Sequence, residues 1–235
     1  MLAQDRTVAA MDCPEGVGVI HVNSALRAHG VIPVVQFSDP VLAVPLVDLL
    51  VDAGLPCIEI TFRAPGAERA IQLVRTQRPE VLVGAGTVLT LAQADAALDA
   101  GAQFVVAPGT NPRVVEHVLA RGGVMLPGIA TPSEIEANLR RGIDVLKFFP
   151  AESLGGIGFL RSVHGPFPEV SFVPSGGLSA ANLPAYLALA NVTAVGGTWI
   201  APRSLLEAGD LESITQAARE AVAIVQHARR APEVP

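Results

Sequence analysis

Eight short apolar runs, each of strand length, recur along this chain of 235 residues and are separated by segments of helical length. The runs are rich in β-branched and aromatic residues, and the segments between them carry helix start signals such as Thr131-Pro132-Ser133-Glu134. Strands that alternate with helices predict a parallel sheet with helical crossovers. The predicted strands are residues 31–35, 57–62, 81–86, 104–109, 124–128, 145–149, 170–175 and 193–197.

Eight such units can close into a barrel or lie open as a doubly wound sheet. The number of units, the chain length and the lack of a GxGxxG turn after the first predicted strand favour a (β/α)8 TIM barrel of the α/β class. Residues 16–29 predict an extra helix across the bottom of the barrel. We expect one barrel domain over residues 16–227, with a flexible N-terminal extension (1–15) and a C-terminal tail (228–235).

Composition excludes several classes of protein. Half of the residues are hydrophobic, but no apolar run reaches the roughly 18 to 20 residues that span a bilayer. The net charge of -6 and the scarcity of aromatic residues argue against a nucleic-acid partner. Cys13 and Cys57 are too few for a disulfide framework or a cysteine metal site. The N-terminus lacks the pattern of a secretory signal, which predicts a cytoplasmic location.

The alternation of side chains within the strands selects the residues that face the lumen. In Cys57-Ile58-Glu59-Ile60-Thr61-Phe62-Arg63 the isoleucines are expected to face the helices, which turns Glu59 and Thr61 to the lumen and Arg63 to its mouth. In the strand at 145–149 the same alternation turns Lys147 and Phe149 inward. The sequence therefore places a carboxylate and an amine together inside the barrel.

Lys147 is the only lysine of the chain, among 16 lysine and arginine residues in total. One interpretation is a structural ion pair with Glu59, although burying two charges stabilises a fold poorly compared with apolar packing. The alternative is that lysine is kept because arginine cannot replace it as a nucleophile. A buried amine beside a proton-transfer group is typical of enzymes that form a Schiff base with a ketone.

Two pairs of glycines follow the last two predicted strands. Gly176-Gly177 ends the seventh strand and Gly196-Gly197 ends the eighth, each just before a helical segment. Barrels often bind phosphate there, because glycine lets backbone N–H groups approach an anion closely. The two pairs together predict a phosphate site, although glycines also serve as simple turns.

At this point the sequence resembles the 2-keto-3-deoxy-6-phosphogluconate (KDPG) aldolases, whose members often also cleave 4-hydroxy-2-oxoglutarate. The resemblance runs from about residue 30 to residue 225. It rests on the ordered motifs EITFR (59–63), GAGTV (84–88), APG (107–109), PGIATP (127–132), KFFPAE (147–152), GPFP (165–168), PSGG (174–177) and GGTW (196–199).

The resemblance implies roles for individual residues. Lys147 would form the carbinolamine and imine, and Glu59 would be the proton shuttle. The residues implied to shape the keto-acid pocket are Arg63, Thr87, Pro108 and Phe149, and those implied to bind phosphate are Gly176, Gly177, Gly196 and Gly197. A homotrimer that needs no metal or other cofactor is implied by resemblance alone.

Two departures from the family pattern concern substrate choice. Many relatives have threonine at the position of Ser175 and serine at that of Thr198, and these side chains are expected near the distal hydroxyl and phosphate end of the substrate. Both positions keep a hydroxyl, which favours the gluconate-type substrate. Some relatives also carry an arginine at the end of the first strand, where this chain has Gln36, leaving Arg63 to pair with the substrate carboxylate.

The predicted function is therefore a class I aldolase that cleaves KDPG to pyruvate and glyceraldehyde 3-phosphate. The alternatives are an aldolase for phosphogalactonate-type or unphosphorylated 2-keto acids, a phosphosugar epimerase or decarboxylase, and a phosphosugar-binding barrel without turnover. These alternatives differ in whether Lys147 forms a covalent adduct and in which substrate is turned over.

Overall fold

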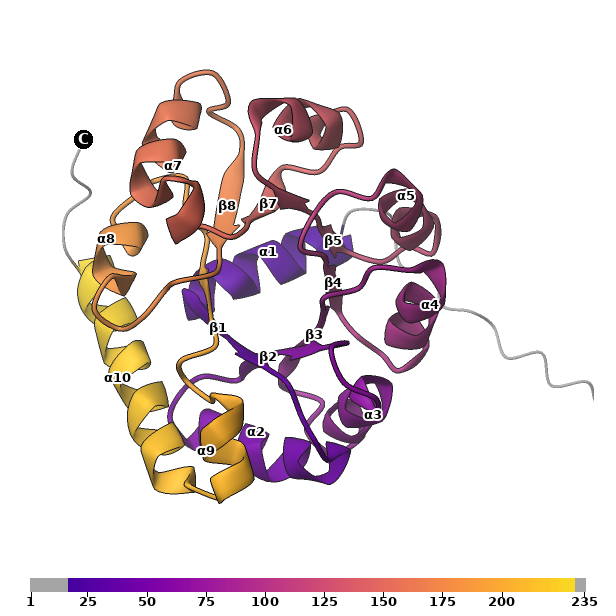
Figure 1. The fold of residues 1–235 in the computed structure, drawn as a ribbon, viewed down its shortest axis with the longest axis vertical. Helices are drawn as coiled ribbons and strands as arrows, with labels where there is room; N and C mark the ends of the chain where they lie inside the picture. Colours follow the sequence, from indigo (N-terminus) through magenta and orange to yellow (C-terminus); the bar gives the residue numbers. More distant parts are fainter. Residues whose placement is uncertain (1–16, 231–235) are drawn as a thin grey trace, which may run out of the picture.

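The computed structural model describes residues 17–230, in which the predicted alternation of strands and helices closes into a ring (Figure 1). The strands within this range are β1 (Val31–Val35), β2 (Cys57–Thr61), β3 (Leu82–Gly86), β4 (Phe104–Val106), β5 (Met125–Leu126), β6 (Gly128–Ile129), β7 (Val145–Phe148), β8 (Ser171–Pro174) and β9 (Val195–Gly197). All of their pairings are parallel. The predicted barrel is confirmed.

The ring closes at two places where regular pairing is interrupted. Hydrogen-bonded neighbours run β5-β4-β3-β2-β1-β9 in one sheet and β6-β7-β8 in the other. The single strand predicted at 124–128 is split into β5 and β6 at Pro127, which has no N–H to donate, although its carbonyl still accepts from the Lys147 N–H at 2.9 Å. Between β8 and β9, bridges join Phe172 to Val192 and Ser175 to Gly196.

Helices surround the ring (Figure 1). In the described part they are α1 (Val17–His29), η1 (Pro40–Leu42), α2 (Ala43–Asp52), α3 (Ala67–Gln77), α4 (Leu91–Asp99), α5 (Pro112–Ala120), α6 (Pro132–Leu139), η2 (Glu152–Leu154), α7 (Gly156–His164), α8 (Leu183–Leu187), α9 (Arg203–Ala208) and α10 (Leu211–Arg230). The predicted start at 131–134 is a capping box, in which Thr131 and Glu134 each bond to the other's backbone N–H. None of these helices is long and apolar enough to cross a bilayer.

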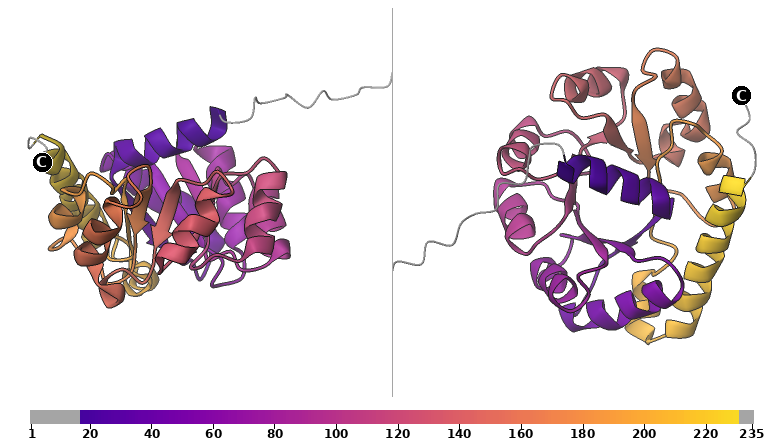
Figure 2. Two further views of the ribbon diagram at one scale, coloured as in Figure 1. Left: turned by 90° about the horizontal axis from the view of Figure 1, so that it is seen from above. Right: turned by 180° about the vertical axis from the view of Figure 1, so that it is seen from behind.

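The extra helix predicted at 16–29 is α1, and it lies across the end of the ring opposite the view of Figure 1 (Figure 2). Val22 and Leu26 of this helix pack with lumen residues such as Cys57 and Phe104, in a cluster separate from the layer between strands and helices. Ile58 and Ile60 belong to that outer layer, as the alternation predicts. The lower lumen is therefore filled, and open space is left at the carboxyl ends of the strands.

At the C-terminal end, α10 continues to Arg230, three residues beyond the predicted end of the domain. Residues 228–230 are thus helical rather than the start of a tail. Val225 is buried against the barrel and the Arg229 guanidinium donates to the carbonyl of Ala28 at the end of α1, which holds the last turns in place. The predicted extension (1–15) and the final residues (231–235) lie outside the described residues.

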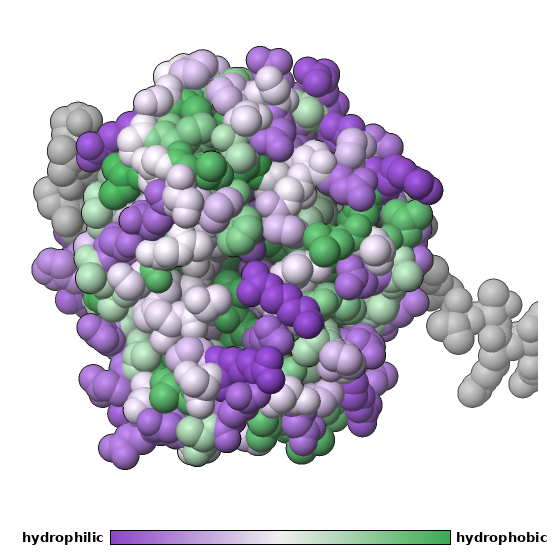
Figure 3. Space-filling view, viewed as in Figure 1, coloured by the Kyte–Doolittle hydropathy of each residue, from purple (hydrophilic) through white to green (hydrophobic). Residues whose placement is uncertain are grey.

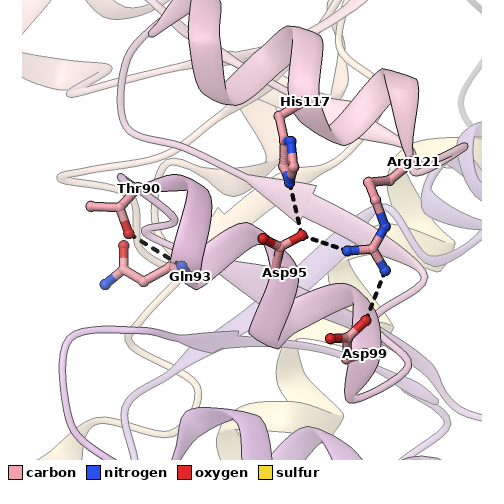
Figure 4. A network of polar contacts seen from close by, with 6 residues as sticks. All are labelled: Thr90, Gln93, Asp95, Asp99, His117 and Arg121. Atoms are coloured by element: carbon pink, nitrogen blue, oxygen red, sulfur yellow. Dashed lines mark hydrogen bonds and ion pairs between the residues drawn. The ribbon is translucent and has the colours of Figure 1, made fainter.

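A network of charged side chains joins α4 to α5 (Figure 4). Asp95 accepts from His117 Nε2 at 2.8 Å and from Arg121 at 2.5 Å, and Arg121 also reaches Asp99 at 2.7 Å. The hydrogen bonds from His117 and Arg121 hold the pKa of Asp95 below its usual value. These side chains are between 30% and 68% exposed, so water screens the ion pairs and they contribute little to stability.

Gly84 on β3 is predicted to be essential for packing, because a methyl group there would overlap the buried ring of Phe104. Gly84→Ala should lower the free energy of unfolding by about 1 to 3 kcal/mol, measured by urea denaturation. Gly158 in α7 is the matched control, because a methyl group there meets no neighbour within 4 Å. Gly158→Ala should be neutral or stabilise by up to about 1 kcal/mol. Equal stability of the two variants would contradict this account of the lumen.

Candidate active site

Lys147 projects from β7 into the lumen, as predicted. Its neighbour Phe148 points the other way and stacks on Phe159 of α7, with ring centroids 4.6 Å apart. The Lys147 side chain is buried, and its Nζ lies 3.4 Å from Glu59 Oε1 and 5.5 Å from the centroid of the Phe149 ring. The structure therefore brings the predicted amine and carboxylate to within contact of each other.

Glu59 projects from β2 and is only 1% exposed. Its carboxylate lies over Gly86 on β3, where any side chain would overlap Glu59 Oε1. Gly84 and Gly86 both face the lumen from β3. Gly84 leaves room for the Phe104 ring, and Gly86 leaves room for the Glu59 carboxylate above it. Glycines spaced by two within a strand are a signal of close approach that the sequence analysis did not use.

Cys57 lies two residues before Glu59 on the same side of β2 and is fully buried. Burial raises the pKa of the Cys57 thiol, and the nearby charge of Glu59 raises it further. The thiol therefore stays protonated and packs as an apolar group, which leaves Lys147 as the candidate nucleophile at this place.

Arg63 follows β2 at the mouth of the barrel and is exposed. Its Nε donates to Thr87 Oγ1 at 3.2 Å. Thr87 has φ of 57°, a left-handed conformation that costs a β-branched residue on the order of 1 to 2 kcal/mol. Such a conformation persists only where the surrounding structure requires it. Here it places the Thr87 hydroxyl against the Arg63 guanidinium.

A cavity of about 210 Å³ opens at the carboxyl ends of the strands. It is lined by Val34, Arg63, Lys147, Phe149, Ser175, Gly176, Gly177, Leu178, Gly196 and Thr198. Strongly hydrophilic surface flanks the recessed centre of this face (Figure 3). Eight of the twelve predicted site residues thus line one cavity.

Glu59 and three further predicted residues lie outside that lining. Glu59 contacts Lys147 from below, and Thr87 is connected to the cavity through Arg63. Pro108 is half-buried after β4, with its carbonyl against Gly128. Gly197 is covered by the ring of Trp199, which a methyl group at this position would overlap.

Two lining residues were not predicted from the sequence. Val34 lies in a continuous apolar run that gives no signal of a site, and Leu178 directly follows the glycine pair. A second hollow of about 340 Å³ shares Val34, Arg63 and Thr198 with the first and extends to Gln36 and Arg203. The catalytic cavity therefore opens toward a second region that carries an arginine and an amide.

The loop after β8 is fixed by hydrogen bonds to its carbonyl groups. Those of Ser175, Gly176 and Gly177 accept from the N–H of Ala151 (2.8 Å), the N–H of Glu152 (3.2 Å) and Nδ2 of Asn182 (3.3 Å). In a planar trans peptide the N–H points away from the preceding carbonyl. The N–H groups of Gly176, Gly177 and Leu178 consequently point to the side opposite these donors.

Among residues 17–230, the N–H groups of Gly177 and Leu178 have no acceptor, while the parallel bridge between Ser175 and Gly196 directs the Gly176 N–H to the Gly196 carbonyl. Gly176 and Gly177 have φ of 94° and 80°, which glycine adopts without strain. The Ser175 hydroxyl is also buried without a hydrogen-bond partner, and all these residues line the cavity. Unpaired donors gathered at one end of a cavity form a nest suited to an anion.

Across residues 17–230, no three His, Cys, Asp or Glu side chains are grouped as a metal site would require. The chemistry available in the cavity comes from an amine and a carboxylate in contact, a guanidinium at the mouth and a nest of N–H donors at the far end. This set suits a carbonyl substrate that carries anionic groups at both ends.

Comparison with known proteins agrees with this geometry. The family described as KDPG and KHG aldolase matches residues 22–217. The 2-dehydro-3-deoxy-phosphogluconate aldolase of Treponema pallidum (strain Nichols) is 46% identical over 207 residues, which cover 88% of this chain and 99% of that protein. The KHG/KDPG aldolase of Escherichia coli (strain K12) is 41% identical over 199 residues, covering 85% and 93%.

Among solved structures, the KDPG aldolase from Legionella pneumophila with pyruvate captured as a covalent carbinolamine matches with a TM-score of 0.81. It is 35% identical to this chain, and the match covers 84% of this chain and 96% of that one. The family match, the relatives and the shared fold all indicate a KDPG or KHG aldolase. The chain belongs to the KDPG and KHG aldolase family.

Proposed function

We propose that this protein is a class I aldolase that cleaves KDPG to pyruvate and glyceraldehyde 3-phosphate and also accepts 4-hydroxy-2-oxoglutarate. The observation that carries the proposal is the contact of Lys147 Nζ with Glu59 Oε1, at 3.4 Å, beside the cavity that ends at the glycine nest. The names of the relatives and the captured carbinolamine of the Legionella enzyme support the same reaction.

The reaction begins when the neutral amine of Lys147 attacks the C2 ketone of the substrate. Glu59 relays protons as the carbinolamine loses water and becomes an iminium ion. Glu59 then accepts the proton of the C4 hydroxyl, the C3–C4 bond breaks, and its electron pair moves into the iminium to give an enamine. The aldehyde product leaves with its phosphate.

Glu59 next returns the proton to C3 of the enamine, and hydrolysis of the resulting imine releases pyruvate and restores Lys147. Arg63, held by Thr87, neutralises the carboxylate of the keto acid, while Phe149 bounds the methyl end of the pocket. Pro108 follows β4 on the neighbouring rim and limits the pocket on that side.

The phosphate is assigned to the nest after β8, with the Gly177 N–H as a donor and with Gly176 and Gly196 bounding the same end of the cavity. Ser175 and Thr198, whose side chains line the same end, are assigned to the distal hydroxyl of the substrate. Gly197 contributes by leaving room for the Trp199 ring rather than by direct contact.

Cleavage rates test the substrate assignment. We expect kcat/KM for KDPG to exceed that for 4-hydroxy-2-oxoglutarate by at least about tenfold, because the nest pairs with phosphate. It should also exceed kcat/KM for the phosphogalactonate isomer, which carries the same phosphate, because Ser175 and Thr198 are assigned to the hydroxyl of the gluconate-type substrate. Pyruvate release is measured with each substrate under the same conditions. A higher kcat/KM for 4-hydroxy-2-oxoglutarate would identify the runner-up function. Binding of inorganic phosphate without turnover of any of the three would indicate a binding barrel.

The assembly and location of the protein belong to the same proposal. The family resemblance supports a homotrimer, which sedimentation equilibrium would test directly. A cytoplasmic location follows from the small-molecule metabolic substrate, and cell fractionation would test it.

A further inference from the structure

Tyr186 and Glu152 form a hydrogen bond directly behind the glycine nest. Tyr186 is the only tyrosine of the chain, and its side chain in α8 is fully buried. Its hydroxyl donates to Oε1 of Glu152 at the start of η2. Burial raises the pKa of Tyr186, and the carboxylate raises it further, so the hydroxyl remains a donor. The bond joins the segment after β7 to the helix after β8.

Glu152 also contacts the nest itself. Its backbone N–H donates to the Gly176 carbonyl at 3.2 Å. A side chain at Gly177 would lie 2.7 Å from Glu152 Cβ and Cγ, so the backbone of Gly177 rests directly on the stem of Glu152. Gly156 likewise makes room for the pair, since a methyl group there would lie 2.8 Å from the Tyr186 hydroxyl.

The carbonyl side of the nest is also held by the residues that lead into α8. Asn182 Nδ2 donates to the Gly177 carbonyl at 3.3 Å, and Asn182 Oδ1 accepts from the Ser179 N–H at 2.8 Å. Tyr186 lies one helical turn after Asn182. The distance between α8 and η2 therefore sets how the carbonyls of the nest, and with them its N–H groups, are oriented.

We propose that Tyr186 and Glu152 are positioning residues that tune the nest and thereby set the preference for phosphorylated over unphosphorylated 2-keto acids. The inference rests on the proposed function, because it takes the nest to hold the substrate phosphate. Neither side chain lines the catalytic cavity, so both act through the orientation of Gly176 and Gly177.

The test compares KDPG with 4-hydroxy-2-oxoglutarate in Tyr186→Phe. We expect KM for KDPG and the inhibition constant of inorganic phosphate to rise about tenfold, because small misplacements of binding groups weaken binding strongly. We expect kcat for KDPG and both constants for 4-hydroxy-2-oxoglutarate to stay within about twofold. Glu152→Gln keeps an acceptor for Tyr186 and should retain the wild-type KM for KDPG or lower it.

Two further variants separate positioning from general damage. Glu152→Ala removes the acceptor at an exposed position and should raise KM for KDPG as Tyr186→Phe does. It therefore tests the same hydrogen bond in the case that Tyr186→Phe folds poorly. Gln103→Ala removes bonds to Val83 N–H and Arg75 before β4, near the closed end of the barrel. It should leave the ratio of the two KM values unchanged.

Equal changes with both substrates, or no change with either, would overturn the positioning role. The wild-type enzyme distinguishes this failure from failure of the proposed function. If inorganic phosphate does not inhibit wild-type cleavage and KM is the same for both substrates, the nest does not bind phosphate. The assignment of the substrate phosphate to the nest and the inference about Tyr186 and Glu152 are then both wrong. If phosphate does inhibit the wild type but Tyr186→Phe behaves identically, only the inference about Tyr186 and Glu152 is wrong.

Discussion

Replacing Lys147 by alanine should lower kcat for KDPG cleavage by on the order of 10⁴-fold or more, since no other amine can form the imine in its place. The variant should also lose stability by about 3 to 5 kcal/mol if Glu59 stays ionised, because the buried carboxylate loses its partner. Steady-state pyruvate release and urea denaturation measure the two effects. Adding Glu59→Gln to Lys147→Ala should restore much of the stability without restoring activity.

Lys147→Arg separates the nucleophile from the ion pair. Arginine keeps a positive charge next to Glu59, but its guanidinium stays protonated and cannot attack a ketone. We expect this variant to be as inactive as Lys147→Ala while unfolding at a higher urea concentration. Substantial activity in Lys147→Arg would mean that Lys147 acts only through its charge, which would leave a structural ion pair or acid–base chemistry without an imine.

Glu59→Gln should reduce kcat by about 10²- to 10⁴-fold, the range that removal of a general acid–base group produces. The amide is nearly the same size, so it should still fit over Gly86 and leave the fold intact. Imine formation with pyruvate should persist at a lower rate. The specific measurement is exchange of the pyruvate methyl hydrogens with deuterium oxide, which requires proton transfer at C3.

A matched control for Glu59→Gln is available on the surface. Glu116 pairs with Arg141 at 3.1 Å in an exposed position, and Glu116→Gln should leave both kcat and exchange unchanged. If Glu59→Gln exchanges the methyl hydrogens at the wild-type rate, Glu59 is not the proton shuttle. The carboxylate would then serve only to pair with Lys147.

The alternation of side chains made much of this site predictable from the sequence. Ile58, Ile60 and Phe148 are apolar and pack outward, so the residues between them had to point into the lumen. Because the carboxyl ends of parallel strands meet at one end of a barrel, Glu59 and Lys147 could be placed together although 88 positions separate them. The two-residue alternation of side chains along each strand thus determines which of them meet in the lumen.

Features that depend on contacts across the barrel were not predictable in this way. The splitting of the fifth strand at Pro127 follows from one missing N–H, but the sequence does not show that β6 then pairs with β7 rather than with β4. The left-handed backbone of Thr87 has no local signal in a β-branched residue. The covering of Gly197 by Trp199 also depends on a ring orientation that spacing does not determine.

Mass spectrometry of the protein after incubation with pyruvate and sodium borohydride tests the central claim most directly. Borohydride reduces an imine to a stable amine, so the wild-type protein should gain the mass of one reduced pyruvyl group, and peptide mapping should place it on Lys147. Lys147→Ala should gain nothing under the same conditions. An unmodified wild-type protein, or an adduct on a residue other than Lys147, would contradict the Schiff-base mechanism.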